Sequence, residues 1–143
     1  MTIDARLNMI MVGATDIATL RHFYEAGLGW TPWGPTSPMS VMYKLGTAVL
    51  VFLNKGYLAS ESGQQVADTP RSIWAIFVED KAAVDAQFAT AAAAGATITS
   101  PVRNRDGGLY SGYFADPEGN GWELVWSPHM PVAADGSLSL PGQ

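Results

Sequence analysis

The sequence predicts an α+β domain built from two similar βαβββ modules. An apolar segment followed by an aspartate that can cap a helix occurs twice, and Asp80 stands 64 residues after Asp16. Met9 and Ile73, which lie in the two apolar segments, are separated by the same 64 residues. Each copy continues through a glycine and a short extended segment to a pair of apolar runs typical of a hairpin. Two halves with the same order of elements favour an internal duplication.

Composition limits the class of protein. The 143 residues suffice for a single domain, which we expect to span residues 1–143. The formal charge of −5 argues against nucleic acid or an anionic membrane surface as a partner. There is no cysteine, so neither a disulfide nor a thiolate ligand can form. The first residues lack a signal-peptide pattern and no apolar run approaches the roughly 20 residues of a membrane span, so we expect a cytoplasmic protein.

The first module is expected at residues 7–54. Asp16 suits a helix N-cap because its carboxylate can accept a hydrogen bond from a free backbone N–H. Ile17, Leu20 and Tyr24 follow at helical spacing. The predicted segments are a strand at 7–13 buried on both faces, a helix after Asp16 that ends at Gly27 or Gly29, a short edge strand at 30–35, and a hairpin of 41–45 with 47–53 around Gly46.

A polar connector is expected at 55–70, with one helical turn near 58–65, before the second module at 71–128 and a tail at 129–143. The second set of predicted segments is a strand at 72–78 buried on both faces, a helix capped by Asp80 that ends at Gly95, a short strand at 96–102, a polar loop at 103–109 and a hairpin at 111–127. Residues 104–110 suit either a lid over a cavity or an ordinary surface loop.

The last strand of this hairpin separates apolar from ionisable side chains. Side chains alternate between the two faces of a strand, so Trp122, Leu124 and Trp126 share one face. Glu123 and Val125 share the other. A buried carboxylate is costly unless it is paired, which makes Glu123 the leading candidate for a functional side chain.

Two segments resemble the vicinal oxygen chelate superfamily, the group of glyoxalase I, bleomycin-resistance proteins and extradiol dioxygenases. They are DIATLRHFYEAGLGW at residues 16–30 and FADPEGNGWELV at residues 114–125. The resemblance covers about residues 7–128. It implies a curved mixed sheet in which the two modules enclose a cavity, commonly completed by a second copy, so we expect a homodimer.

Metal-dependent members of that superfamily place ligands on the first and last strand of each module. Carried over by position, the resemblance assigns these places to Met9, Leu50, Ile73 and Glu123. Three of the four are apolar, and one carboxylate is a poor site for a divalent ion. We therefore expect neither a metal nor another cofactor.

The expected cavity is an apolar bowl with one acid. Strand alternation assigns Met9, Met11, Leu50, Phe52 and Ile73 to the concave face. Aromatic side chains from neighbouring strands and loops are candidates for its walls, although their faces are not fixed by the sequence: Trp30, Trp33, Tyr43, Tyr110 and Tyr113. Such a lining suits a hydrophobic or aromatic small molecule, unless these side chains fill the core and leave no cavity.

Glu123 is open to four interpretations. Burial raises the pKa of a carboxyl group, which prepares it for acid–base catalysis near neutral pH. An ionised Glu123 can instead anchor a cationic ligand, or be one remaining ligand of a metal site. The plain structural alternative is an ion pair with Arg103 or Arg105 from the preceding loop.

The leading hypothesis is a metal-independent small-molecule-binding protein of the bleomycin-resistance type. The alternative is a metal-free lyase or isomerase in which Glu123 is the general acid or base. A metal-dependent glyoxalase or dioxygenase relative is the third.

Overall fold

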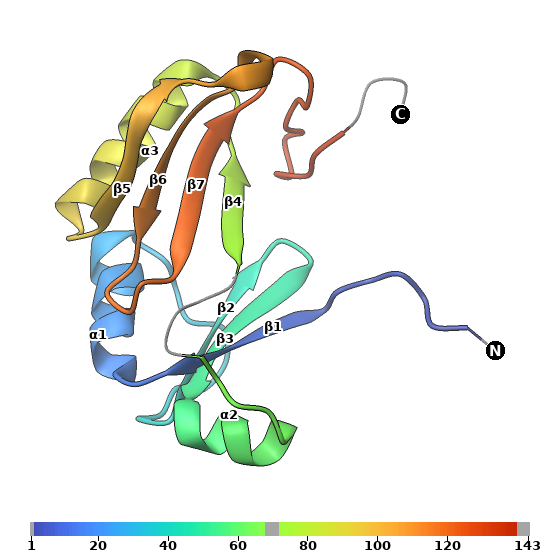
Figure 1. Ribbon diagram of the computed structural model, residues 1–143, viewed down its shortest axis with the longest axis vertical. Helices are drawn as coiled ribbons and strands as arrows, with labels where there is room; N and C mark the ends of the chain where they lie inside the picture. Colours follow the sequence, from blue (N-terminus) through green and yellow to red (C-terminus); the bar gives the residue numbers. More distant parts are fainter. Residues whose placement is uncertain (1, 68–71, 140–143) are drawn as a thin grey trace.

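The computed structural model describes residues 2–67 and 72–139 (Figure 1). Its elements occur in the order strand–helix–strands–helix–strand–helix–strands. The strands are β1 (Met9–Ala14), β2 (Ser40–Leu45), β3 (Ala48–Asn54), β4 (Ile73–Phe77), β5 (Thr97–Asn104), β6 (Tyr110–Ala115) and β7 (Gly121–Trp126). The helices are α1 (Ile17–Arg21), its π-helical continuation η1 (His22–Gly27), α2 (Lys55–Ser62), α3 (Lys81–Ala93) and the single turn η2 (Asp106–Gly108).

The strands form two mixed sheets, one per module. The first sheet has the order β1-β3-β2 and the second the order β4-β7-β6-β5. In each sheet the first strand of the module is parallel to the last, and the remaining neighbours are antiparallel. The α+β fold with two related modules is therefore confirmed, and the two sheets do not close into a barrel.

Both aspartates predicted as helix caps perform that role. Asp16 accepts a hydrogen bond from the Thr19 N–H at 3.0 Å, and Asp80 accepts one from the Ala83 N–H at 2.7 Å. The first helix then widens into η1, which ends at Gly27 as predicted. Its consecutive Phe23 and Tyr24 side chains are both buried.

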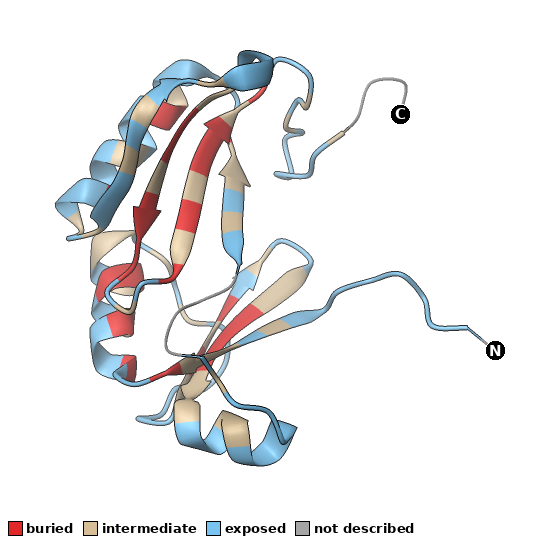
Figure 2. Ribbon diagram, in the orientation of Figure 1, coloured by how far each residue is buried: buried red, intermediate tan, exposed pale blue. Residues whose placement is uncertain are grey.

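Helices α1, η1 and α3 cover one face of the two sheets (Figure 1). The other face is free of helices on the second sheet, whereas α2 packs against β1 and β3 at one end of the first. On β7, Trp122 and Leu124 are buried and Glu123 is half-buried, as the alternation predicts. On β4, Ile73 and Ala75 are exposed (Figure 2), so the prediction that strands β1 and β4 are buried on both faces is wrong for the single chain. Their outward side chains lie on the open faces.

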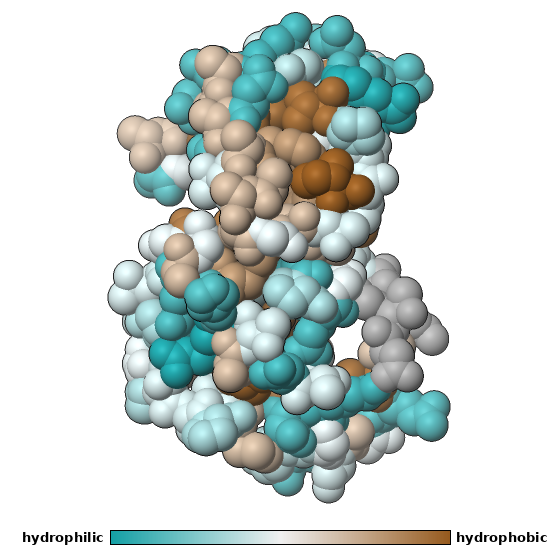
Figure 3. Space-filling view, turned by 90° about the vertical axis from the view of Figure 1, so that its left-hand side faces the viewer, coloured by the Kyte–Doolittle hydropathy of each residue, from teal (hydrophilic) through white to brown (hydrophobic). Residues whose placement is uncertain are grey.

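The hydrophobic core lies between the helices and the two sheets. Figure 3 shows the helix-covered side, which is mostly hydrophilic in its lower half, with separate hydrophobic side chains at the surface of the upper half. Tyr24, Phe52, Phe114 and Leu124 are all buried in one core cluster. Because the cluster draws on both sheets and both long helical segments, the two modules share a core.

Two predicted segments differ from the structure. Residues 30–35 form no strand, because Pro32 and Pro35 cannot donate to a ladder, and only the Trp33 N–H bonds the neighbouring strand, at Met42 O. The first sheet therefore has three strands instead of four. The connector contains the eight-residue α2 in place of one turn, whereas residues 68–70 of the connector and residue 71 of the second module lie outside the described residues.

No helix in the described ranges is both long and apolar enough to cross a membrane. The tail carries a short bridge between Val132 and Leu138. Its last residues, 140–143, lie outside the part of the chain described.

Candidate functional site

Glu123 lies near the middle of the open face of the second sheet. In the strand register it stands between Ala75 on β4 and Tyr113 on β6. Ala75 is exposed and Tyr113 is half-buried. The carboxylate is therefore within reach of a ligand on this face, and apolar residues such as Ile73 and Val125 share the same side of the sheet.

A buried hydroxyl fixes the carboxylate. Ser111 Oγ donates a hydrogen bond to Glu123 Oε2 at 2.8 Å, and Ser111 has no exposed surface. A side chain buried in this way cannot also be solvated, so Glu123 is the partner that satisfies its hydroxyl. Ser111 carries no signal of its own in the sequence, although its place two residues before Tyr113 puts it on the same face of β6.

Tyr113 is the second hydroxyl beside the carboxylate. Burial, and then the hydrogen bond and negative charge of Glu123, raise the pKa of Tyr113, while the charge of Arg105 opposes the change. Tyr113 therefore stays protonated at neutral pH and offers an O–H donor next to Glu123.

Arg105 completes the cluster without pairing with Glu123. Its guanidinium donates from Nε to Ser111 O at 3.1 Å, and from Nη2 to Ser100 Oγ at 2.9 Å and Pro101 O at 3.0 Å. Its Cζ lies 4.8 Å from the centroid of the Tyr113 ring, a cation–π contact. The predicted ion pair of Glu123 with Arg103 or Arg105 does not form, since the two ion pairs among the described residues lie elsewhere.

Three of the predicted lining residues lie on open faces. Met11 is 57% exposed and Ile73 is 58% exposed, while Met9 is at 36%. Register places Met9 opposite Val49 and Met11 opposite Val51 on the open face of the first sheet. These side chains are available to a ligand or to a second copy of the chain.

The predicted face of Leu50 and Phe52 is wrong. Both are buried beneath α1 and η1, on the face of the first sheet opposite to the one that carries Met9 and Met11. The strand is apolar on both sides, so its sequence carries no alternation from which to read the face. Tyr43 pairs with Leu50 in register and shares this core position.

The other aromatic candidates are dispersed. Tyr110 lies on the helix-covered face, where its hydroxyl donates to Asp85 of α3 at 2.7 Å. Trp30 stacks on Tyr24 with ring centroids 5.0 Å apart. Trp33 is 46% exposed and lies 5.8 Å from the Lys44 ammonium. The structure thus groups only Tyr113 of these residues with Glu123.

The positions that would hold a divalent ion do not carry suitable donors. The corrected register places Val51, not Leu50, at the position that corresponds to Glu123. Met9, Val51 and Ile73 supply no oxygen or nitrogen ligand, so these side chains do not fit a divalent ion. In the described ranges 2–67 and 72–139, no three His, Cys, Asp or Glu side chains gather in a way that could hold a metal.

Residues 6–124 match the model of the Glyoxalase/Bleomycin resistance protein/Dioxygenase superfamily. The chain belongs to this superfamily. In this member of the superfamily, Glu123 and its hydroxyl partners lie on the open face of the second sheet.

Solved glyoxalase-like structures share the fold. A glyoxalase-related enzyme from Fulvimarina pelagi is 29% identical, with a TM-score of 0.88 over 95% of this chain and 98% of that one. A family enzyme from Burkholderia phytofirmans PsJN is 21% identical, with a TM-score of 0.72 over 85% of this chain and 98% of that one. A lactoylglutathione lyase from Agrobacterium tumefaciens is 21% identical, with a TM-score of 0.65 over 87% and 96%. Comparison with curated proteins finds no match.

Proposed function

We propose that this glyoxalase-like protein binds a small molecule with an apolar or aromatic body on the open face of the second sheet. The observation that carries the proposal is the Glu123–Ser111 hydrogen bond at 2.8 Å. It holds a carboxylate in place on a sheet face that no helix covers. Ligand sites typically combine apolar walls with a few fixed polar groups.

The polar cluster offers complementary groups. The second oxygen of Glu123 can accept a hydrogen bond from a ligand amine or hydroxyl, and the Tyr113 hydroxyl oxygen, whose proton faces Glu123, can accept another. Arg105 donates its Nε and Nη2 hydrogen bonds to Ser111 O and Ser100 Oγ. Its positive charge therefore lies near the cluster without forming an ion pair with Glu123. A ligand with an apolar body and a polar end fits this arrangement.

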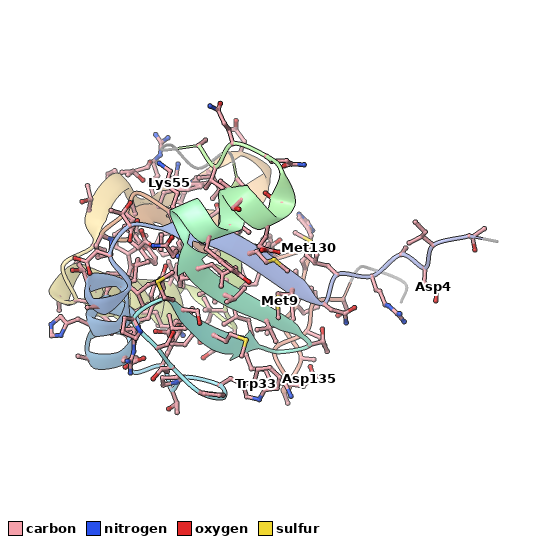
Figure 4. The ribbon with its side chains drawn as sticks, turned by 90° about the horizontal axis from the view of Figure 1, so that it is seen from below. Asp4, Met9, Trp33, Lys55, Met130 and Asp135 are labelled. Atoms are coloured by element: carbon pink, nitrogen blue, oxygen red, sulfur yellow. The ribbon has the colours of Figure 1, made fainter. Side chains whose placement is uncertain are left out.

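A second copy of the chain is the expected cover of the open faces. Besides Met11 and Ile73, Ile3 is 98% exposed and Leu7 is 63% exposed. Figure 4 shows that the segment around Asp4 extends away from the body of the domain. Soluble monomers rarely leave many large apolar side chains open on adjoining surfaces, so we propose a homodimer whose partner encloses the ligand.

Native mass spectrometry and thermal unfolding of the untagged protein test the two parts of this proposal. We expect the mass of a dimer. In a separate thermal-unfolding measurement, a panel of neutral, cationic and anionic aromatic compounds should include ligands that raise the melting temperature. Glu123→Gln should weaken the cationic ligands most, because it removes the negative charge. Glu61→Gln on the exposed surface of α2 is the matched control. A monomer that responds to no compound on the panel would contradict the proposal.

A second candidate function is a metal-free lyase or isomerase reaction with Glu123 as general acid or base. The two hydroxyl groups beside its carboxylate support it, because they can stabilise the charged form or pass on a proton. The same Glu123→Gln variant separates the candidates. An enzyme of this kind loses turnover and keeps most of its affinity for a neutral substrate, whereas a binding protein has no turnover to lose.

A further inference from the structure

A cavity lies at the seam between the two modules, on the face of β7 opposite Glu123. Its volume is about 340 Å³, which is at the lower end of the range for small-molecule sites. It lies between β4 and the β2–β3 hairpin, both of which contribute to its lining. Its lining includes Trp30, Leu45, Ala48, Leu50, Trp74 and Trp122.

Three indole rings form the wall of this seam cavity. The Trp122 ring lies 5.7 Å from Trp30 at an interplanar angle of 84°, and 5.1 Å from Trp74 at 70°. These edge-to-face contacts set neighbouring rings nearly perpendicular. An inserted flat ring can therefore stack on one indole while it meets the edge of the next, the two arrangements that aromatic pairs prefer.

The lining contains no charged side chain. The indole N–H of Trp122 donates to Tyr24 Oη at 2.9 Å, so this donor is already used within the core. A water molecule needs two or more polar partners to be held in a cavity. The seam cavity therefore favours an uncharged apolar occupant over water or an ion.

We propose that the seam cavity is a second binding site, for an uncharged planar aromatic molecule of one ring or two fused rings. The site is separate from the Glu123 face, because Trp122 and Glu123 are adjacent on β7 and point to opposite faces. The inference does not depend on the proposed function. It adds a site that a ligand reaches without contact with Glu123.

Ala48 and Val49 provide a matched pair of variants. Ala48 lies on the same face of β3 as Leu50 and lines the cavity, whereas Val49 points to the opposite face. Ala48→Phe fills the cavity, and Val49→Phe places the same ring on the same strand outside it. Naphthalene is the probe, since it is flat, uncharged and free of hydrogen-bonding groups.

The measurement is titration of the ¹⁵N-labelled full chain with naphthalene, followed by NMR. We expect shifts of the Trp30, Trp74 and Trp122 indole signals, and nuclear Overhauser contacts between these rings and the probe in the unmodified protein. Ala48→Phe should lose these shifts, while Val49→Phe and Glu123→Gln should retain them. The contacts in the unmodified protein keep the test valid if Ala48→Phe fails to fold.

Two results would overturn the inference. One is the absence of contacts between naphthalene and the three indoles. The other is loss of naphthalene binding in Glu123→Gln, which would place the probe on the Glu123 face. A failure of the proposed function leaves a different pattern, with intact naphthalene binding and no ligand that depends on Glu123.

Discussion

The Tyr24 hydroxyl donates a 2.7 Å hydrogen bond to Asp116 Oδ2, and both side chains are buried. Tyr24 belongs to the helix of the first module, and Asp116 begins the turn between β6 and β7 in the second. Trp122 Nε1 donates to the same tyrosine oxygen at 2.9 Å, and Asn120 Nδ2 donates to Asp116 Oδ2 at 2.8 Å. The two sequence segments that resemble the superfamily thus meet in one buried polar network that joins the modules.

Tyr24→Phe should destabilise the fold. The substitution removes the donor to Asp116 and leaves the buried Trp122 N–H without an acceptor, a loss of about 1–3 kcal/mol. Urea unfolding followed by circular dichroism measures it. Tyr57→Phe is the control, because Tyr57 is 53% exposed and its loss should change the unfolding free energy little. Equal stabilities of the two variants would contradict the role of this network.

Alkaline pH should weaken the fold partly through Tyr24. Burial, and then the charge of Asp116, raise the pKa of Tyr24 above the ordinary tyrosine value of 10.0. Below pH 10 both states keep the proton and the contribution is complete. As the pH rises past 10, only the unfolded state releases the proton, so stability is lost. The unfolding free energy should fall less between neutral pH and about pH 11 in Tyr24→Phe than in the unmodified protein. Equal losses in the two proteins would show that Tyr24 is not a source of the alkaline destabilisation.

Glu118→Ala should loosen the start of the first helix. The Glu118 carboxylate accepts hydrogen bonds from the backbone N–H groups of Thr15 at 2.7 Å and Asp16 at 2.9 Å. Hydrogen bonds to charged groups contribute about 1.5–3 kcal/mol at most sites and less where solvent competes. Hydrogen exchange at Thr15 and Asp16 should accelerate, while exchange at the start of α3 stays unchanged. Uniform acceleration across both helices would indicate global destabilisation instead.

Gly112→Ala should disturb the packing of α3 on the second sheet. A Cβ at Gly112 would lie 2.5 Å from Phe88 Cε2 and 2.7 Å from Val102 Cγ2, closer than packing allows. Overpacking of this kind typically costs about 1–3 kcal/mol. Thermal unfolding of Gly112→Ala, and of its combination with Phe88→Leu, measures the effect. We expect the smaller side chain at position 88 to restore part of the lost stability, and additive losses would contradict a direct clash.

Short-range sequence patterns were sufficient to predict most of the helices and strands. The two aspartate caps, the β2–β3 hairpin and the closing hairpin follow from short-range signals, because caps and turns depend on residues within a few positions of each other. The faces of Trp122 and Glu123 were also predictable, since β7 alternates between core and open side. The face of Leu50 was not, because β3 is apolar on both sides and only pairing with β1 sets its register.

The candidate site shows the same division. Glu123 was found from its position in an apolar strand. Its partners were not, because Ser111 is an ordinary serine in sequence and Arg105 belongs to a loop whose course depends on β5 and β6. Trp30 and Trp33 were equivalent candidates for cavity walls in the sequence, yet Trp30 is half-buried and stacked on Tyr24, whereas Trp33 is exposed.

The sequence by itself determined the duplicated α+β plan, the helix starts and the single carboxylate on the last strand, because these depend on periodicity and on local hydrogen bonds. Only the tertiary structure decided which groups hold Glu123, which faces remain open and where the modules leave a cavity. Those features depend on contacts between residues far apart in the chain, such as Tyr24 with Asp116. Such contacts exist only after the two modules have packed on a shared core.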